Sequence, residues 1–251
     1  MLVFAHYSNT RNIGDLACAP YRYFPFPQYK VADVHRPAPL RGRVIVVGGG
    51  AVAQHVERAV ADDPEAIVVG WGVGDSRHGL RTPREPPPGV ALYGSREWGQ
   101  KGTIHVPCVS CMSPLFDAPP PPSRPYVLFT NAGKRIMDTY PVRIDGMPEL
   151  RNHTTMEEAV AFLASGETVL TNSYHGAYWG TLLRRRVVIV NPYSSKFHNF
   201  RFQPVIATDA GWKDAAERAI VFPQALDEAR AANLAFHRRV MSFIETGHDL
   251  A

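Results

Sequence analysis

The chain has 251 residues, of which 45% are hydrophobic and 20% charged, a composition typical of globular proteins. This length permits one large domain or two small ones. The 27 Lys and Arg residues outnumber the 23 Asp and Glu residues, which gives a formal charge of +4 without any run of five like charges. The charge pattern argues against nucleic-acid binding and favours a small anionic substrate held by a few cationic side chains.

The sequence shows no sign of export or of a membrane span. Residues 1–8 lack a basic region, and no later stretch approaches the roughly 18 uninterrupted apolar residues that a spanning helix needs. We therefore expect a cytoplasmic protein. Peripheral association with a membrane stays open, and nothing in the sequence indicates an oligomeric state.

Short apolar segments in the first half are typical of strands in a parallel sheet. The expected strands are 2–7, 44–47, 66–69, 90–93 and 103–106, and the expected helix is 52–62. The β-branched run Val44–Val47 leads into Gly48–Gly50, and the strand 66–69 leads into Gly70–Gly74. Two glycine-rich strand exits separated by one helix indicate a βαβ unit. Residues 16–42, rich in aromatic residues and proline, are expected to be irregular.

The sharpest break in composition is the proline-rich segment 119–125, which favours an extended polyproline linker. We place it between an N-terminal domain of residues 1–118 and a C-terminal domain of residues 126–251. The expected strands after it are 126–130, 168–171 and 187–190, and the expected helices are 155–165, 177–183 and 225–245. The predicted fold is α/β with two Rossmann-like halves, and its ligand would lie in a cleft between them.

Neither glycine-rich exit completes a nucleotide-binding motif. Gly48–Gly50 and Gly70–Gly74 lack the full G-x-G-x-x-G pattern, and the chain has no G-x-x-x-x-G-K-[ST]. We interpret both exits as tight turns that let a ligand or a facing backbone come close. No bound cofactor is expected.

The three cysteines are an odd number, which argues against a framework of disulfides. Cys108 and Cys111 have Cys-x-x-Cys spacing, and the third is Cys18. A tetrahedral zinc site would need two further ligands, and a redox motif would open a helix after an N-terminal strand. We interpret Cys108 and Cys111 as a buried structural pair in a loop, with zinc or redox chemistry as the less favoured alternative, and we expect no metal site.

The most informative segment, Thr168–Trp179, is a strand that delivers a histidine and a glycine to the start of the next helix. An imidazole at a helix N-terminus could donate a proton, or it could contact a phosphate or carboxylate. Alternatively, His175 caps the helix or forms a hydrogen bond in the wall of the cleft. The residues alone leave these interpretations open.

Four motifs, taken in order, resemble the polysaccharide pyruvyl transferase family. They are Asn12-x-Gly14-Asp15, the exit Val44–Gly50, the exit Gly70–Gly74 and Thr171–Gly176, and the similarity spans residues 7–197. The resemblance implies a fold similar to GT-B glycosyltransferases and a reaction in which phosphoenolpyruvate forms a pyruvate ketal on a sugar. It also implies that the acceptor is a sugar or a lipid-linked glycan. Many members have Arg-Leu-His-Gly where this chain has Ser173-Tyr174-His175-Gly176.

The resemblance also implies roles for individual residues. His175 would be the acid/base, and Asp15 would orient the acceptor hydroxyls. The expected donor-side residues are Lys134, Arg135, Ser173, Tyr174, Gly176 and Lys196. The expected acceptor-side residues are Asn12, Gly14, Gly48, Gly49, Gly50 and Trp71.

Two other functions remain as alternatives. A nucleotide-sugar-dependent glycosyltransferase would use the same architecture and the same helix N-termini for a diphosphate. A non-catalytic sugar-binding protein of polysaccharide assembly would bind glycans without turnover.

Overall fold

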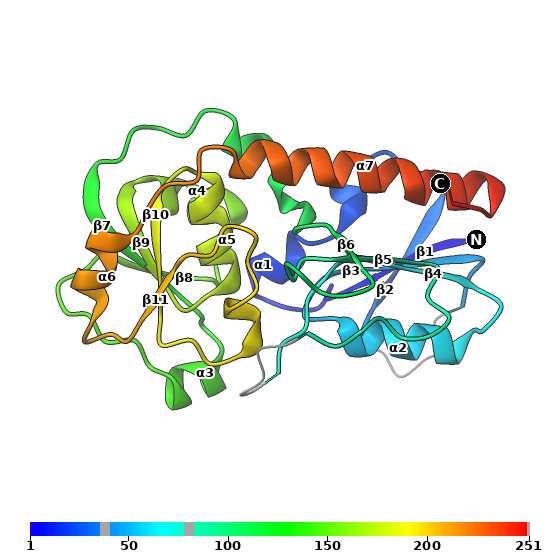
Figure 1. Ribbon diagram of the computed structural model, residues 1–251, viewed down its shortest axis with the longest axis horizontal. Coiled ribbons are helices and arrows are strands. Elements are labelled where there is room, and N and C mark those ends of the chain that lie inside the picture. The colour runs from blue at the N-terminus through cyan, green and yellow to red at the C-terminus, as the bar shows by residue number, and fades with distance from the viewer. Residues whose placement is uncertain (36–40, 78–82, 250–251) are drawn as a thin grey trace.

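The computed structural model describes residues 1–35, 41–77 and 83–249, and it contains two parallel β-sheets arranged along the long axis of the molecule (Figure 1). The first sheet contains β1 Leu2–His6, β2 Tyr29–Asp33, β3 Val44–Gly50, β4 Ile67–Val73, β5 Leu92–Ser95 and β6 Ile104–His105. The second contains β7 Arg124–Thr130, β8 Glu149–Arg151, β9 Gly166–Thr171, β10 Arg186–Val190 and β11 Val205–Ala207.

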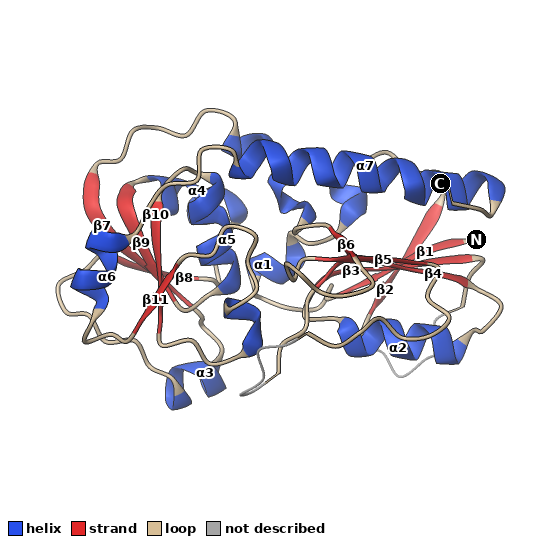
Figure 2. Ribbon diagram, in the orientation of Figure 1, coloured by secondary structure: helices blue, strands red, loops and turns tan. Residues whose placement is uncertain are grey.

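Helices cover the sheets and connect their strands (Figure 2). The α-helices are α1 Ile13–Leu16, α2 Ala53–Asp62, α3 Lys134–Thr139, α4 Met156–Ala164, α5 Tyr174–Leu182, α6 Trp212–Arg218 and α7 Ala225–Thr246. The short 3-10 helices are η1 Pro20–Arg22, η2 Val109–Met112, η3 Pro114–Phe116 and η4 Ser195–Phe197. Within the described ranges, no helix combines the length and the apolar character needed to cross a membrane.

The two sheets share the order of their first five strands. The first runs β2-β1-β3-β4-β5-β6 and the second β8-β7-β9-β10-β11, with parallel pairing throughout. In each sheet the second strand lies on one side of the first and the later strands lie on the other. The chain therefore changes direction across the sheet between β1 and β3, and again between β7 and β9. The predicted α/β class with parallel sheets is confirmed, and it is compatible with two Rossmann-like halves.

The central strands of the first sheet are buried on both faces, which explains the continuous β-branched run in β3. Val44 and Val46 belong to the core cluster on the α7 side, whereas Ile45 and Val47 pack with α2 on the other side. All four side chains are at most 3% exposed. The second sheet is covered in the same way, with α4 and α5 on one face and α6 on the other.

Helix α7 connects the two halves (Figure 1). Its first turns, with Ala225 and Ala229, pack into the core of the second half, and Phe236 and Val240 pack against the first sheet. Gly94 permits this contact, because a Cβ there would lie 2.8 Å from the ring of Phe236. The last helix of the predicted C-terminal domain therefore contributes to the core under the first sheet. The predicted linker and domain boundaries stay predictions.

The structure contains elements that the sequence did not reveal. Strand β2 lies within the segment expected to be irregular, and β8, β11, α1, α3 and α6 were not predicted. Strands β3 and β4 continue through their glycines to Gly50 and Val73. Helix α5 begins at Tyr174, three residues before its predicted start at Ala177, so that His175 lies in its first turn.

Candidate functional site

A polar cavity of about 360 Å³ lies between the two sheets. Every residue that lines it follows the carboxyl end of a parallel strand: β1, β2, β3 and β5 in the first half, and β7, β9 and β10 in the second. The lining residues are Tyr7, Asn9, Thr10, Asn12, Asp15, His35, Ala51, Arg96, Asn131, Ser173, Tyr174, His175 and Lys196. Ligands of open α/β sheets bind at this edge, where the strand order reverses. This polar cavity adjoins both reversal points.

The turn after β1 is held by its own side chains and by the second half. Asn12 caps α1, since its Oδ1 accepts from the Gly14 N–H at 3.1 Å and its Nδ2 donates to Asp15 Oδ2 at 2.8 Å. Asn152, which follows β8, donates to Asn12 Oδ1 at 3.0 Å, and its carbonyl accepts from the Ile13 N–H at 3.0 Å. This network fixes the carboxylate of Asp15 at the wall of the polar cavity.

The turn after β9 is buried and is held by hydrogen bonds from its own side chains. Thr171 Oγ1 donates to the Phe129 carbonyl at 2.6 Å and accepts from the Ser173 N–H at 2.9 Å. Ser173 caps α5, with its Oγ accepting from the Gly176 N–H at 3.5 Å. A Cβ at Gly176 would lie 2.3 Å from Thr171 Oγ1, so the helix can start this close to the strand only with glycine there.

Gly14 and His175 form the contact between the two turns. A Cβ at Gly14 would lie 2.1 Å from His175 Nδ1, so the imidazole occupies the space that any other residue would fill. His175 is 4% exposed and lines the polar cavity. Gly14 in the early motif and His175 in the late motif, 161 positions apart in the sequence, are thus in direct contact.

The imidazole of His175 is held by two thiols. Its Nε2 lies 3.4 Å from Cys18 Sγ and 3.4 Å from Cys108 Sγ, and the two sulfurs are 3.3 Å apart. Burial opposes ionisation of Cys108, but hydrogen bonds from Cys18, His175 and Ser110 outweigh it and hold the pKa of this thiol well below its usual value. The hydrogen bond to Cys108, together with burial, raises the pKa of Cys18.

The structure corrects the interpretation of Cys108 and Cys111 as a pair. Both are buried, as predicted, but Cys111 Sγ accepts from Asn233 Nδ2 at 3.4 Å whereas the neighbour of Cys108 is Cys18. The spacing along the chain suggested a partner three residues away, and the fold supplies one 90 residues away.

Arg96 is a site residue that sequence reasoning missed. It directly follows β5, is 4% exposed, and places its guanidinium 3.7 Å above the ring of Tyr174. In the part of the chain that the structure describes, its Nε has no hydrogen-bond partner. Glu97 lies 3.7 Å away, but burial outweighs the attraction of Arg96 and raises the pKa of Glu97 to about 7. A buried guanidinium with an unused donor favours an anion beside it.

The place of Arg96 in the sequence, shortly after a predicted strand, could have identified it as a site residue. The sequence predicts a strand at 90–93, and ligand-binding groups of parallel sheets follow such strands. Gly74, which directly follows β4, leaves the space that the arginine occupies, because a Cβ there would lie 2.2 Å from Arg96 Nε.

The predicted cations are divided between the cavity and the surface. Lys196 lines the polar cavity, and its Nζ donates to the Tyr193 hydroxyl at 2.9 Å. Lys134 and Arg135 are exposed at the start of the six-residue helix α3, and neither lines the cavity. The structure therefore brings Lys196 to the site, together with Arg96, and leaves the α3 pair outside it.

The predicted acceptor-side residues also divide. Asn12 lines the polar cavity, whereas Gly48 and Gly49 let the segment after α1 pack against β3, and Gly50 leaves room for Tyr7 and Asp15. A Cβ at Gly49, where φ is +57°, would lie 1.9 Å from Cys18 Cβ. Trp71 is 1% exposed in the core, where its Nε1 donates to Asn233 Oδ1 at 2.9 Å. These glycines shape the site indirectly, and Trp71 supports the packing of α7.

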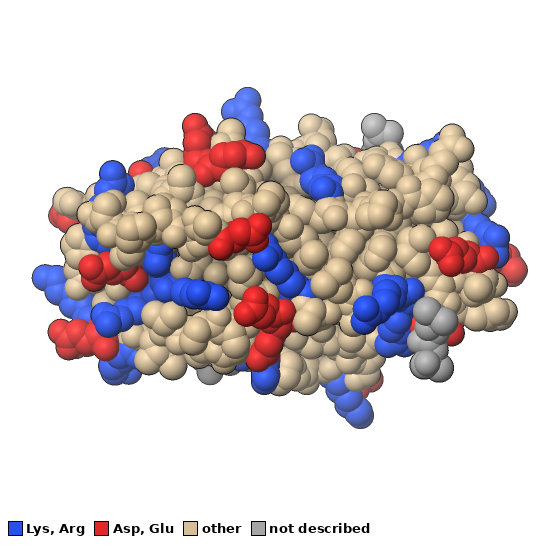
Figure 3. Space-filling model, turned by 90° about the horizontal axis from the view of Figure 1, so that it is seen from above, with Lys and Arg blue, Asp and Glu red and all other residues tan. Residues whose placement is uncertain are grey.

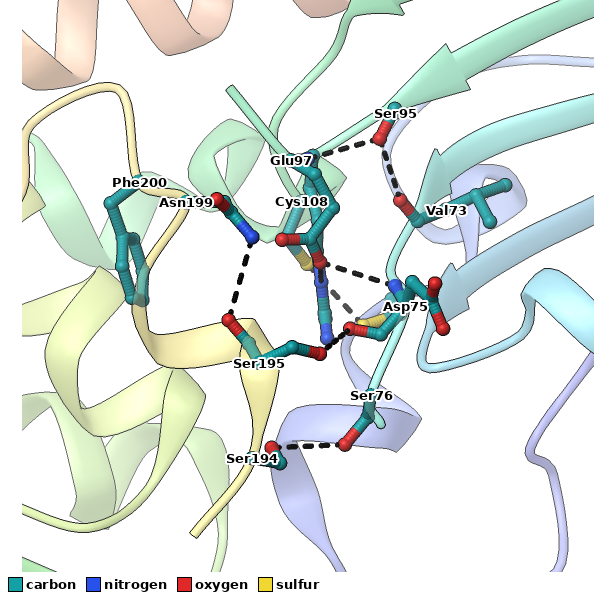
Figure 4. Close-up of polar contacts among 12 residues, drawn as sticks. Val73, Asp75, Ser76, Ser95, Glu97, Cys108, Ser194, Ser195, Asn199 and Phe200 are labelled. Atoms are coloured by element: carbon teal, nitrogen blue, oxygen red, sulfur yellow. Dashed lines mark hydrogen bonds and ion pairs between the residues drawn. The ribbon is translucent and has the colours of Figure 1, made fainter. Parts of the chain in front are cut away.

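Hydrogen bonds tie the two halves together beside the polar cavity (Figure 4). Ser195 Oγ donates to the Asp75 carbonyl at 3.3 Å, and Ser76 Oγ donates to Ser194 Oγ at 3.0 Å. The Asp75 N–H in turn donates to Glu97 Oε1 at 3.1 Å. The loop after β4 is thereby joined both to η4, which carries Lys196, and to the residue next to Arg96.

A second cavity, of about 410 Å³, lies on the other side of Arg96 and Tyr174, and we call it the apolar cavity. Aromatic and small side chains make up most of its wall, and an ion pair between Arg201 and Glu228, with a separation of 3.4 Å, borders it. On the face seen in Figure 3, acidic and basic side chains are interspersed rather than gathered in one broad basic area. The polar cavity is therefore the better place for a small dianion.

The polar cavity combines a buried cation, a second cation, a carboxylate and a thiol-bound histidine, contributed by both halves. These groups suit the binding of an anion and the transfer of protons beside it. Comparisons of the chain with models of protein families, with curated proteins and with solved structures gave no match.

Proposed function

We propose that the protein transfers the enolpyruvyl group of phosphoenolpyruvate to a sugar, or to a lipid-linked glycan, as a pyruvate ketal. The observation behind this proposal is that Asn12–Asp15 and Ser173–Gly176, the motifs that resemble pyruvyl transferases, converge with Arg96 and Lys196 at one cavity. In this proposal the architecture is GT-B-like and the polar cavity is its substrate cleft.

Phosphoenolpyruvate carries a carboxylate and a phosphate, so its site needs at least two cationic groups or helix N-termini. Arg96 offers a buried guanidinium from the first half, and Lys196 offers an ammonium group from the second. The start of α5 adds the positive end of a helix dipole. Arg96 thus takes the role expected of the arginine that many family members have at the position of Ser173.

The reaction requires one proton to reach the methylene carbon and two hydroxyl groups to lose theirs. Protonation of the enol forms the methyl group, one sugar hydroxyl attacks the cationic carbon, and the second closes the ketal as phosphate leaves. Of the two hydroxyl protons, one replaces the proton that the acid donated and the other leaves with phosphate, so the balance closes.

His175 and Asp15 are the groups placed to move these protons. Because both thiols contact Nε2, Nδ1 is the imidazole nitrogen that remains; it lies against Gly14 at the wall of the polar cavity, and no described residue forms a hydrogen bond with it. Asp15, held by Asn12 at 2.8 Å, would orient and deprotonate an acceptor hydroxyl from the opposite wall.

Release of inorganic phosphate from phosphoenolpyruvate in the presence of a panel of glycosides tests the proposal. We expect phosphate release that requires an acceptor, together with a product that carries a ketal-linked pyruvate. Phosphoenolpyruvate should also raise the thermal midpoint with the logarithm of its concentration. A nucleotide sugar that raises the midpoint while phosphoenolpyruvate does not would favour a glycosyltransferase, and glycan binding without turnover would favour a sugar-binding protein.

A further inference from the structure

The cluster of Cys18, Cys108 and His175 brings three metal-ligating atoms together from three distant parts of the chain. Cys18 follows α1, Cys108 precedes η2, and His175 lies in the first turn of α5. The three atoms are separated by 3.3, 3.4 and 3.4 Å, and the residues are 0%, 0% and 4% exposed.

We propose that these three side chains form a zinc site with two thiolates and one imidazole as ligands. Thiolate sulfur and imidazole nitrogen are the ligands that Zn²⁺ prefers in proteins. With Zn–S distances of about 2.3 Å, tetrahedral zinc needs sulfurs about 3.7 Å apart, so the two thiols would separate by roughly 0.4 Å. The triangle formed by the two sulfurs and Nε2 is thus slightly smaller than the triangle of ligand atoms around a bound zinc ion.

Charge balance supports two thiolates with one neutral imidazole. A divalent ion cancels the charge of both thiolates, so that the buried cluster becomes neutral.

The surroundings hold the ligands in the way that residues behind a metal site usually do. Ser110 Oγ donates to Cys108 Sγ at 3.2 Å and accepts from Trp179 Nε1 at 2.9 Å, which fixes the sulfur from outside the triangle. Gly14 and Gly49 leave the space that His175 and Cys18 occupy.

A disulfide explains the cluster less well. The sulfurs of Cys18 and Cys108 lie 3.3 Å apart, well beyond the roughly 2.05 Å of a disulfide bond, and both cysteines are free. A disulfide would also leave unexplained why His175 directs the same nitrogen at both sulfurs. Cys111 is not a fourth ligand in this arrangement, since its sulfur accepts from Asn233. Three protein ligands are the pattern of an open zinc site.

Zinc content of the purified, tag-free protein tests the site. We expect about one zinc ion per chain after gel filtration, and a loss of roughly tenfold or more in Cys18→Ser and Cys108→Ser. Cys111→Ser is the matched control, because this thiol is equally buried in the same loop but faces away, and it should keep its zinc. Replacing zinc by Co²⁺ should produce thiolate-to-cobalt charge-transfer absorption and the visible bands of tetrahedral cobalt.

Several results would overturn the zinc site. One is wild-type protein that holds no zinc, both as purified and after incubation with zinc chloride and removal of the excess. Others are an intact mass that shows a disulfide between Cys18 and Cys108, or equal zinc loss in Cys111→Ser. If the two serine variants do not fold, the cobalt spectrum of the wild type decides, since it needs no substitution at a ligand. Zinc on Nε2 would prevent His175 from exchanging a proton near neutral pH, so His175 acts as the acid/base of the proposed function only in the zinc-free protein. None of these measurements uses phosphoenolpyruvate, so the zinc site and the proposed function can fail independently.

Discussion

Each half places a turn at the carboxyl end of a central strand, β1 in the first half and β9 in the second, but the two turns are stabilised differently. In the second half the turn opens α5, a nine-residue helix in which every residue is buried. In the first half it opens α1, which has four residues and buries only Gly14. The first turn is also fixed from outside, since Asn152 of the second half bonds to Asn12.

This difference assigns the turns different roles. The turn after β9 is held by contacts within the second half, so it is suited to hold a proton-carrying group in one place. The turn after β1 depends on the second half for its position, and it presents Asn12 and Asp15 on the more open side. Substitutions in the turn after β9 should therefore impair chemistry. Substitutions at the contact between the two turns should impair both stability and chemistry.

The largest effect should come from His175→Ala. Loss of a positioned acid/base should lower kcat for phosphate release by about 10²–10⁴-fold, while circular dichroism shows the fold retained. His175→Asn can imitate a hydrogen bond but cannot exchange a proton near neutral pH, so it should be almost as inactive. Near-normal turnover of the Asn variant would mean that His175 is a contact, and Asp15 would become the next candidate for the acid.

Arg96→Ala should have the next largest effect, on donor affinity rather than on the fold. A charged contact is worth about 1.5–3 kcal/mol, so calorimetry should show phosphoenolpyruvate binding weakened by about 10- to 150-fold. Arg201→Ala is the matched control, since Arg201 borders the apolar cavity and not the polar one. Equal losses in both variants would place the donor in the apolar cavity.

Gly14→Ala tests the contact between the turns directly. The new Cβ would meet the ring of His175, so either the two turns must move apart or the ring must move. We expect a loss of about 1–3 kcal/mol in the free energy of unfolding, measured with urea, and slower turnover. In a His175→Ala background the collision disappears, and a double-mutant cycle should recover most of the loss. Additive losses would show that the clash is not with His175.

The sequence predicted elements wherever one local pattern decides the structure. Two such patterns are the β-branched runs of β3 and β4 and the apolar residues at helical spacing in α7. Each pattern alone predicts the strand or helix that the structure contains. Strand β2 escaped prediction because it is an edge strand with three exposed residues, so its sequence carries no buried alternation. Its parallel pairing with β1 decides its conformation instead.

The site was predicted in part, for a related reason. Asp15 and His175 were identified because each lies in a motif of the resemblance and follows a predicted strand. Arg96 carries no motif, and its importance follows from burial and an unused donor, which depend on the whole fold. Trp71 shows the opposite case, since a conspicuous residue at a glycine-rich exit is used for packing.

Glu97, beside Arg96, should make stability depend on pH. Burial raises its pKa in the folded protein to about 7, above the ordinary value of 4.5, so the folded state holds a proton that the unfolded state has lost. Stability should therefore fall as pH rises from about 4.5 through 7, by an amount on the order of 1–3 kcal/mol. Urea unfolding at several pH values should show that Glu97→Gln removes this decline. A decline that persists in the variant would assign it to another group.

The smallest effect should come from Arg135→Ala, which sharpens the contrast between a buried and an exposed cation. Arg135 lies at the start of the short helix α3, exposed and away from the lining of the polar cavity, whereas Arg96 is buried in that lining. An exposed charge at that position is screened by water and salt, so its removal should change the affinity for phosphoenolpyruvate by less than about 0.5 kcal/mol. Calorimetry on Arg135→Ala and Lys134→Ala, beside Arg96→Ala under the same salt conditions, provides the measurement. A loss in either α3 variant that matches the loss in Arg96→Ala would mean that α3 closes over the bound donor, and the division of the cations between cavity and surface would then hold only for the ligand-free protein.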